Sequence, residues 1–579
     1  MARLGGGYVS IFDYENNSNE KIGVVESVDT ANIIIKIENE EKLKKMQVNH
    51  LIVVQSSKVG QHLIALVNKI MRNSSIEAVD EDNKPIYSIE NVVKATLIGT
   101  HLDIFGTKPN IFKRTLETVP EIDADCYLLQ GERLTNFMKA ISHIAIDSEN
   151  PLTLGNYTLD DNAEAWLDGN KFFQRHAVIV GSTGSGKSWT VARLLEQVAS
   201  LPSANVLVFD IHGEYKTLKG KGFQHVKIAG PNDNINDGIL FLPYWLLTYE
   251  EMISLMLDRS DNNAPNQAMA FSNAVLEQKR SNLISLGKNN VASNFTIDSP
   301  VPYKLSELLC EFKRLDEEMV PGVRGDKQGP LNGKLTRFIQ RLETKKNDKR
   351  LNFMFNESPD TLEYNYMDKI CKILMHSSSL QRDKGVKVID FSEVPSDVLP
   401  LMVSLVGRII FSIQQWVEKE KRHPIALFCD EAHLYLPEKT NSTIEEAGLQ
   451  NFERIAKEGR KYGVGLVVIS QRPAEVNRTI LSQSNNFIAM RLTNAEDQAV
   501  IKRLLPDSLG SFSELLPVLD VGEALVVGDA SLLPSRIKIK TPSMKPNSAT
   551  IDFWDEWQSP STEDVISTAI EALRKQSRQ

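Results

Sequence analysis

One glycine-rich loop limits the fold of this chain more than any other segment. Residues 181–188 read Gly-Ser-Thr-Gly-Ser-Gly-Lys-Ser, after an apolar stretch that predicts a strand, Ala177–Val180, and before a predicted helix, Trp189–Ala199. In this strand–loop–helix order, a GxxxxGK[ST] motif turns backbone N–H groups around phosphates, and the start of the helix adds its partial positive charge. The pattern predicts a nucleotide-binding loop in a parallel α/β fold.

Each residue of this loop has an expected role. The glycines let the backbone turn its N–H groups inward, Lys187 is expected to reach the β and γ oxygens of ATP, and Ser188 is expected to ligate Mg²⁺. Because it contacts the transferred phosphoryl group, Lys187 is also expected to act in catalysis. The predicted nucleotide-binding residues are Gly181, Ser182, Thr183, Gly184, Ser185, Gly186, Lys187, Ser188 and Trp189.

A second predicted strand, Ile425–Cys429, ends in the adjacent acids Asp430 and Glu431. Two acids at a strand end can simply mark a turn, but together with the phosphate-binding loop they predict the rest of an ATP site. Phosphoryl transfer depends on placement and charge stabilisation, so Asp430 is expected in the Mg²⁺ shell and Glu431 is expected to orient the attacking water. A third buried strand, Val464–Ser470, brings Gln471 to its end as a sensor of the γ-phosphate.

The sequence Asp430-Glu431-Ala432-His433 also spells the box of DEAH helicases. Those enzymes place their acids much closer to the phosphate-binding loop and then add a second RecA-like domain. Here the acids lie far downstream of Lys187, and the residues after Glu431 suffice to complete one sheet but hardly to build another. The chain is therefore predicted to hold one RecA-like core, and the second wall of its ATP site is expected from a neighbouring subunit.

The end of the helix before the third strand carries four cations, Arg454, Lys457, Arg460 and Lys461. Cations at a helix C-terminus complement the helix dipole by about 0.3–1 kcal/mol each. The alternative is that Arg460 is an arginine finger that reaches the ATP of a neighbouring subunit. The residues alone favour neither interpretation.

Hydrophobic patterning divides the chain into segments. Short β-branched runs predict a small β-barrel at the N-terminus, and buried strands that alternate with helices predict an α/β core, interrupted by helix-type sequence. The predicted domains are a barrel over 1–115, a connecting segment over 116–150, a RecA-like core over 151–240 and 386–540, a helical insert over 241–385, and a C-terminal tail or brace over 541–579. Further core strands are expected at Val206–Asp210, Val386–Phe391, Phe487–Met490 and Ala524–Val527.

Charge and composition exclude several classes of protein. The 579 residues carry a formal net charge of −9, the wrong sign for a protein that coats nucleic acid with its whole surface, so any DNA contact must be local. The sequence has no uncharged apolar run of about 18 or more residues that would indicate a membrane span. The four cysteines lie far apart without a CxxC pair, which argues against a disulfide framework or a zinc site. A cytoplasmic protein without a membrane partner is expected.

The combined motifs resemble the HerA family, within the wider HerA/FtsK group of ring ATPases. The resemblance spans residues 151 to about 530 and rests on Arg175–Val180, Val208–Tyr215, Leu242–Leu247, Asp430–His433, Glu458–Gly463 and Ser470–Pro473. It implies a hexameric, DNA-translocating ATPase that uses ATP and Mg²⁺ and commonly acts with a nuclease. It also implies that Arg460 is the finger in trans and that Asp210 and Glu214 lie beside the nucleotide, although a strand-end Asp often caps the next turn instead.

Weaker signals concern DNA and metal contacts. The run Lys334–Arg350 is strongly basic, which suits a phosphate-binding patch but is more often a solvated helix face. The better candidates for DNA contacts are loops after the central strands, at Lys216, Lys219, Lys221 and residues 436–448. His212 and His433 have no partner ligands at zinc spacing, and His433 is expected to serve packing or coupling within the ATP site.

Three outputs remain open. The chain could be a DNA-translocating motor that feeds a nuclease or other effector encoded nearby, in DNA processing or anti-phage defence. It could be a nucleotide-gated scaffold that assembles and activates an effector, or an export pump of the conjugation type, which usually has membrane segments. The sequence contains no second cluster of catalytic residues, so the output is expected from a partner, held by the barrel at residues 1–115.

Overall fold

The computed structural model describes residue 12 and residues 21–79, 85–105, 108–144, 151–236, 238–323, 325–375, 384–505, 513–548, 551–558 and 565–575. The chain folds as two compact units. Unit 1 consists of residues 1–194 and 485–541, and unit 2 of residues 195–484 and 542–579. The division falls inside the predicted α/β core, so each unit contains part of it.

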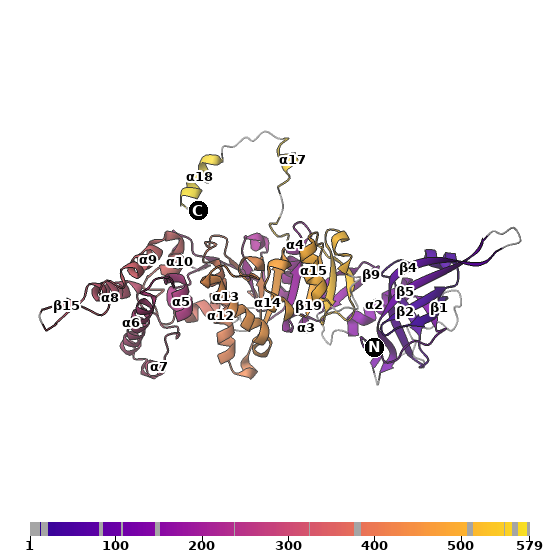
Figure 1. The fold of residues 1–579 in the computed structure, drawn as a ribbon, viewed down its shortest axis with the longest axis horizontal. Helices are drawn as coiled ribbons and strands as arrows, with labels where there is room; N and C mark the ends of the chain where they lie inside the picture. Colours follow the sequence, from indigo (N-terminus) through magenta and orange to yellow (C-terminus); the bar gives the residue numbers. More distant parts are fainter. Residues whose placement is uncertain are drawn as a thin grey trace. The chain divides into compact units, whose positions relative to one another are not determined.

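Unit 1 begins with a barrel of antiparallel strands, drawn in indigo in Figure 1. Its strands are β1 (Lys21–Val28), β2 (Asn32–Ile37), β3 (Leu51–Gln55), β4 (Gln61–Val79), β5 (Pro85–Phe105) and β7 (Asp125–Leu128). They pair in the order β2-β1-β7-β3-β4-β5, and a pairing of β2 with β5 closes the ring. Alternate β-branched residues such as Ile33 and Ile35 fill its core. Because β7 lies within residues 116–150, strand pairing continues past residue 115, where the sequence placed the end of the barrel.

The same unit carries a sheet with the strand order β10-β19-β20-β21-β8-β9. These strands are β8 (Leu152–Tyr157), β9 (Asp160–Leu167), β10 (Ala177–Val180), β19 (Asn486–Met490), β20 (Glu523–Gly528) and β21 (Ser535–Ile539). β10 and β19 are parallel, and the remaining neighbours are antiparallel. The helices that begin in this unit include α2 (Gly131–Ile144), α3 (Gly169–Gln174), α4 (Lys187–Ala199) and α15 (Ala495–Leu504). The predicted order of strand, loop and helix is therefore present at β10 and α4.

Unit 2 contains a parallel sheet with the strand order β13-β12-β16-β11-β17-β18. Its strands are β11 (Val206–Asp210), β12 (Phe223–Ile228), β13 (Ile239–Leu240), β16 (Val386–Asp390), β17 (Ile425–Cys429) and β18 (Val464–Ser470). Every residue of β11, β16, β17 and β18 is buried, as continuous apolar strands covered on both faces require. The predicted fold class, an α/β P-loop core with an N-terminal β-barrel and an inserted helical domain, is confirmed.

The helical insert of unit 2 follows β13 (Figure 1, labels α5 to α10). Its helices are α5 (Tyr249–Met256), α6 (Ala264–Ser285), α7 (Asn289–Ala292), α8 (Leu305–Glu317), α9 (Thr336–Asn347), α10 (Asn352–Phe355) and α11 (Tyr366–Leu374). The basic run Lys334–Arg350 forms α9, which buries Phe338 and Leu342. Its cations pair with acids of the insert and its surroundings: Arg341 with Asp258, Lys345 with Asp397, and Lys346 with Glu357. These ion pairs favour a structural role for the run over phosphate binding.

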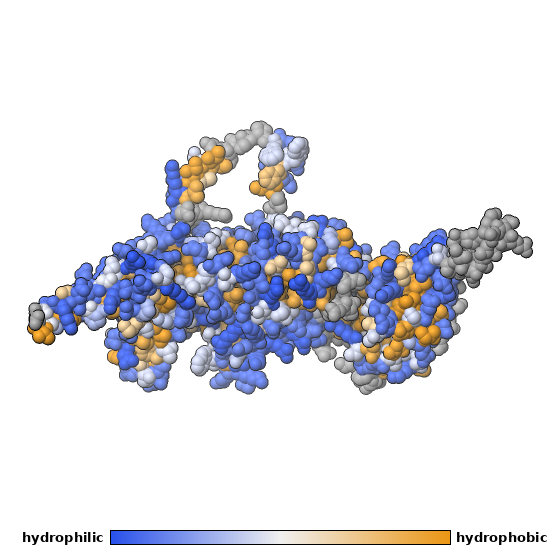
Figure 2. Space-filling view, viewed as in Figure 1, coloured by the Kyte–Doolittle hydropathy of each residue, from blue (hydrophilic) through white to orange (hydrophobic). Residues whose placement is uncertain are grey.

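Three further helices of unit 2 carry long or exposed apolar surfaces. Among the described residues, α12 (Leu399–Trp416) is the one helix long and apolar enough to cross a membrane by length and composition. It is 72% buried within the protein and contacts α13 (Thr443–Glu458), which is typical of a core helix. In the tail, α17 (Phe553–Glu556) and α18 (Ile566–Lys575) each carry an orange patch in Figure 2. The large apolar side chains exposed along these two helices are Phe553, Trp554, Trp557, Ile566, Ile570 and Leu573.

Candidate active site

The loop between β10 and α4 has the backbone path that phosphate binding needs. Gly184 and Gly186 have φ angles of 74° and 104°, left-handed conformations that residues with a Cβ rarely adopt. Gly181 has no room for a side chain, because a Cβ there would lie 2.4 Å from Ser185 Oγ and 2.8 Å from Met490 Cβ. All three glycines are therefore required by the shape of the loop.

The parallel neighbour strand β19 fastens this loop. The N–H of Ser182 donates to the Arg491 carbonyl at 2.8 Å, and Ser182 Oγ lies 3.3 Å from Thr493 Oγ1. The N–H of Gly522 donates to the Ser185 carbonyl at 3.0 Å. Sequence reasoning missed these supports because Thr493 lies 311 positions from Ser182 and no local pattern marks it.

The predicted ligands of phosphate and Mg²⁺ lie in the first turn of α4. Lys187 begins the helix and is 7% exposed, while Ser188 and Trp189 are partly exposed. Ser185 Oγ is buried and has no hydrogen-bond partner among the described residues. The first N–H groups of α4 point out of the helix start, toward the loop. The hydroxyl, the ammonium and these N–H groups form a cradle that an oxyanion fits.

In unit 2, the ends of β17 and β18 bring Glu431 and Gln471 together. The strands are parallel, with Cys429 opposite Val468, so the residues that follow them lie at the same edge of the sheet. Gln471 Nε2 donates to Glu431 Oε1 at 2.5 Å. Asp430 and Glu431 are each 4% exposed, and Glu431 has a φ of 45°, a left-handed conformation that is strained in a residue with a side chain.

His433 lies against the other oxygen of Glu431. Its Nδ1 is 3.3 Å from Glu431 Oε2 and 3.2 Å from Ser470 Oγ. Burial lowers the pKa of His433, so the imidazole is neutral at neutral pH and does not cancel the charge of the acid. These contacts fit the coupling role within the ATP site that the sequence suggested for His433.

Asp210, at the end of β11, is used by the backbone of the following turn. Its Oδ1 accepts from the N–H of Glu214 at 2.9 Å, and its Oδ2 accepts from the N–H of Tyr215 at 3.0 Å. It is fully buried, and burial raises its pKa to about 6. Because both carboxylate oxygens are already occupied, the structure favours the capping interpretation of Asp210 over direct contact with nucleotide. Glu214, which the sequence placed beside the nucleotide, is presented by this capped turn.

A segment of the C-terminal tail, residues 542–548, crosses the same turn. Glu196 of α4 accepts two backbone N–H groups of this segment, at 3.1 and 2.6 Å. The N–H of Asn547 donates to the Glu214 carbonyl at 2.7 Å, and Thr217 Oγ1 donates to a carbonyl of the segment at 2.6 Å. The tail therefore clamps the turn at Glu214, within the segment that the sequence predicted to be a tail or brace, although the sequence did not indicate which turn it contacts.

Arg460 and Glu431 lie at opposite ends of the parallel strands: Arg460 lies before the start of β18, and Glu431 lies after the end of β17. The turn of Arg460, Gly459–Tyr462, directly precedes β18, whose first residue pairs with the first residue of β17. The 5 residues of β17, at about 3.3 Å each, place the acids about 16 Å away from this end, farther than an arginine side chain spans. Arg460 is exposed and has no hydrogen bond or ion pair with a described residue. The Arg460 side chain therefore cannot reach the region of Asp430 and Glu431 in its own chain.

The neighbouring cations of the same helix end have structural partners. The guanidinium of Arg454 lies 5.4 Å from the centre of the Phe411 ring, and Lys457 pairs with Glu453 at 3.2 Å. For these two residues, the interpretation as charges that support the helix end is sufficient.

The buried acids are arranged for a cation. Burial, and then the neighbouring Glu431, hold the pKa of Asp430 well above its usual range. Among the described residues, no group of three His, Cys, Asp or Glu side chains could hold a metal ion by itself. Mg²⁺ in nucleotide sites takes one or two carboxylates plus phosphates and waters, so the carboxylate of Asp430 fits a nucleotide-bound Mg²⁺. The buried Glu431 Oε2, which has no aligned hydrogen bond with a described residue, fits a water between the acid and the nucleotide.

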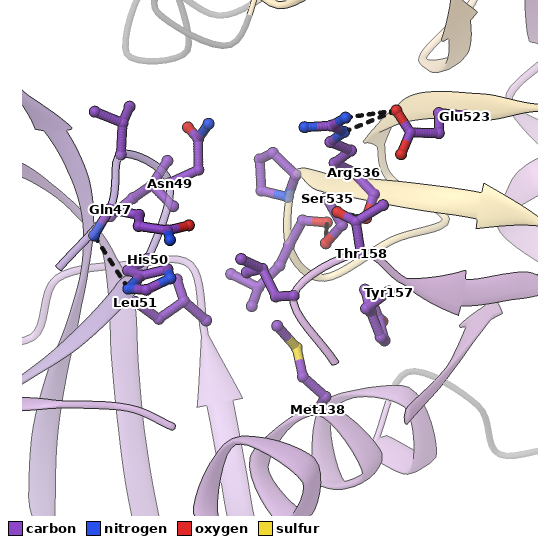
Figure 3. A pocket seen from close by; sticks show the side chains of 15 residues that line it. Gln47, Asn49, His50, Leu51, Met138, Tyr157, Thr158, Glu523, Ser535 and Arg536 are labelled. Carbon is purple, nitrogen blue, oxygen red and sulfur yellow. Dashed lines mark hydrogen bonds and ion pairs between the residues drawn. The ribbon is translucent and has the colours of Figure 1, made fainter. Parts of the chain in front are cut away.

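Unit 1 also contains a cavity of about 250 Å³ that the sequence did not indicate (Figure 3). Residues from the barrel, α2, the end of β8 and the β20–β21 hairpin line it, among them Asn49, His50, Leu66, Met138, Tyr157 and Ser535. On its rim, two nitrogens of Arg536 bind one oxygen of Glu523, at 3.2 and 2.5 Å, and His50 Nδ1 accepts the N–H of Gln47 at 3.3 Å. Since these polar groups already have partners, the cavity lacks a charge set for a ligand.

Comparison with known proteins points to one family. The family model described as "Helicase HerA, central domain" matches residues 152–410. The DNA double-strand break repair helicase HerA of Sulfolobus acidocaldarius is 27% identical over 410 residues, which cover 68% of this chain and 71% of that protein. The chain is therefore similar to the HerA family over its central part. A probable helicase of Methanocaldococcus jannaschii is 24% identical over 546 residues, 89% of this chain and 95% of that protein.

The HerA match includes the phosphate-binding loop, the turn after Asp210, the helical insert and most of α12, whereas Asp430 and Glu431 lie beyond it. Among solved structures, VirB4 of Thermoanaerobacter pseudethanolicus is 18% identical and aligns over 68% of this chain and 98% of that chain, with a TM-score of 0.43. This similarity is too low to add to the assignment. A chain that is similar to HerA helicases and has this loop and this pair of strand-end acids is a P-loop ATPase.

Proposed function

We propose that this chain is an ATP-driven DNA translocase or helicase that works as a closed ring, with a hexamer as the expected size. The observation that carries the proposal is the place of Arg460, which is exposed at the edge of the sheet away from its own Glu431. An arginine there can complete only the ATP site of another subunit, and a repeated head-to-tail contact that closes makes a ring. The relatives named as helicases support DNA as the substrate.

In the proposed site, the phosphate-binding loop and the strand-end acids have complementary roles in nucleotide hydrolysis. Lys187 and the loop N–H groups bind the β and γ phosphates, and Ser188 and Asp430 hold the Mg²⁺ shell. When bound, Mg²⁺ neutralises charge that develops on the phosphates. Glu431 polarises the attacking water, and Gln471 keeps that carboxylate in place through its 2.5 Å hydrogen bond.

Hydrolysis tests this assignment directly. Glu431→Gln should abolish Mg²⁺-dependent ATP hydrolysis while nucleotide still binds, because the phosphate cradle is intact. Lys187→Ala should weaken nucleotide binding as well. A wild-type rate of phosphate release from Glu431→Gln would show that the site is assigned wrongly.

DNA contact is proposed to be local, through loops that face the channel of the ring. Lys216 pairs with Asp390 at 2.8 Å, which leaves the exposed Lys219 and Lys221 as the better candidates. Binding should depend strongly on salt and little on sequence, and duplex DNA should raise the ATPase rate. Replacing both lysines with Ala should reduce that stimulation but not the basal rate. If no nucleic acid stimulated the wild type, a nucleotide-gated scaffold that activates an effector would be the better account.

The output is proposed to come from a nuclease or other effector encoded nearby, in DNA processing or anti-phage defence in the cytoplasm. The barrel is the proposed docking layer, and it exposes the apolar residues Val48, Val59 and Ile104. Glu substitutions at these positions should reduce co-purification with the product of the neighbouring gene and leave ATP hydrolysis unchanged. DNA cleavage by the purified chain alone would contradict the need for a partner.

A further inference from the structure

Tyr215, which follows the capped turn after β11, has a side chain that the proposed mechanism does not use. It is 0% exposed, and its hydroxyl has no hydrogen-bond partner among the described residues. Folded proteins rarely leave a buried hydroxyl in this state without a functional reason or an absent ligand. The position of this group therefore needs an explanation.

The surroundings of the hydroxyl are acidic. Burial, and then the neighbouring carboxylates of Asp430, Glu214, Asp210 and Glu431, raise the pKa of the Tyr215 hydroxyl well above its usual range. A phenol among carboxylates can only donate its hydrogen to them or to a water that they hold. Its natural partner is therefore an acid of the Mg²⁺ site, and Asp430 is the foremost candidate.

The turn that carries Tyr215 is fixed from two sides. Asp210 binds the N–H of Tyr215 at 3.0 Å, and Asn547 of the tail segment binds the carbonyl of the preceding Glu214 at 2.7 Å. The backbone that carries the Tyr215 ring is thus fixed before any ligand arrives. A hydrogen-bond donor that is already fixed in place loses little conformational entropy when an acceptor comes within hydrogen-bonding distance.

Tyr435 shows what an ordinary structural tyrosine looks like at the same place. It is also buried, and its hydroxyl donates to the backbone carbonyl of Asp430 at 2.9 Å. Tyr435 therefore fixes the backbone of Asp430 in the ligand-free protein. The Tyr435 hydroxyl therefore has a hydrogen-bond acceptor, whereas the Tyr215 hydroxyl has none among the described residues.

We propose that Tyr215 is a positioning residue of the Mg²⁺-nucleotide site, whose hydroxyl holds the carboxylate of Asp430 when Mg²⁺ and nucleotide are bound. This inference rests on the proposed function, because it takes Asp430 as a member of the Mg²⁺ shell. Groups that orient a metal-binding carboxylate from behind typically change metal affinity by about 10–100-fold when they are removed.

The test compares Tyr215→Phe with Tyr435→Phe in the full chain, since each change removes one hydroxyl and keeps the ring. Melting temperature is measured without ligand, and then with saturating ADP over a series of Mg²⁺ concentrations. Tyr215→Phe should melt like the wild type without ligand and should need about tenfold more Mg²⁺ for half of the stabilisation. Tyr435→Phe should melt lower without ligand, because it leaves a buried carbonyl unpaired, and should change the Mg²⁺ dependence less than Tyr215→Phe does, because the lost bond is to the Asp430 backbone and not to its carboxylate.

Two results would overturn the inference in distinguishable ways. If Tyr215→Phe melted lower without ligand and kept the wild-type Mg²⁺ dependence, Tyr215 would be a structural residue, and the nucleotide site would stand. If ADP and Mg²⁺ failed to stabilise the wild type at all, the assignment of Asp430 to the Mg²⁺ shell would fall, and the role of Tyr215 with it.

Discussion

Mixing two inactive variants would show whether Arg460 acts across a subunit boundary. Arg460→Ala should lower the ATPase rate by about 10³-fold or more, as expected for loss of an arginine finger. The variant should fold normally, because Arg460 is exposed and has no described partner to leave unpaired. Glu431→Gln should be inactive for a different reason, since it loses the acid that orients water.

The fraction of ATPase activity that should return in mixed rings follows from the distance between Arg460 and Glu431 within one chain. Arg460 and Glu431 lie at opposite ends of a 5-residue strand, about 16 Å apart, so one ATP site needs them from two subunits. In rings assembled at random from equal amounts of the two variants, a site has both intact groups with a probability of one half times one half. About a quarter of the wild-type rate should therefore return. If Arg460 served its own chain, no site in the mixture would be complete.

The assay is steady-state ATP hydrolysis by mixed rings, with subunit exchange verified by pulling down one affinity tag and detecting a second. Lys461→Ala is the matched control, because Lys461 is an exposed cation on the same turn, and it should hydrolyse ATP at nearly the wild-type rate. Verified exchange with a rate no higher than that of the separate variants would refute the finger in trans.

Three further predictions address the loop, the sensor and the barrel. Gly181→Ala should weaken binding of a fluorescent ATP analogue more than Gly184→Ala, because an added Cβ meets Ser185 and Met490 at the first position and nothing within 4 Å at the second; equal affinities would contradict the packing argument. Gln471→Leu should slow hydrolysis by about 10–100-fold, the effect of one hydrogen bond to a charged group, with nucleotide affinity unchanged, and a fall in affinity alone would count against the sensor role. Burial lowers the pKa of His101 from 6.5 to about 4, so the unfolded chain binds its proton first, and stability that is complete above pH 6.5 is lost as the pH falls to 4, by about 3 kcal/mol. Hydrogen exchange of the barrel strands should show this loss in the wild type and much less of it in His101→Leu, and equal acid sensitivity would disprove the assignment.

The limits of the parallel strands could be predicted because the pattern that marks each strand lies within a short stretch of sequence. β11, β17 and β18 are continuous apolar runs bounded by polar residues, and the predicted and observed limits agree at Val206–Asp210, Ile425–Cys429 and Val464–Ser470. β7 shows the opposite case, because its four residues join the barrel only through pairing with the distant strands β1 and β3. No sequence pattern within Asp125–Leu128 predicts that pairing.

The site was predictable to the extent that its motifs are contiguous. The glycine-rich loop and the adjacent acids are each written in one stretch of sequence, whereas the role of Asp210 depends on where the N–H groups of Glu214 and Tyr215 fall in space. An acid at a strand end has the same sequence whether it caps a turn or contacts a ligand. The clamp on this turn joins residues 347 positions apart, at Glu196 and Ser543, and no local pattern encodes such a contact.

The helical insert is tied to the turn that carries Arg460 by a buried carboxylate. Glu251 of α5 is 3% exposed and accepts two hydrogen bonds of 2.8 Å from Arg408 of α12 and one of 3.1 Å from Asn451 of α13. Removing any one partner from such a buried ion pair typically costs about 3–5 kcal/mol, so α5, α12 and α13 resist separation. α13 ends at the turn Gly459–Tyr462, so the helix that contacts Glu251 is the helix that leads directly into the turn of Arg460. In the proposed ring, the insert therefore helps to set the position of the residue that one subunit offers to the ATP site of the next.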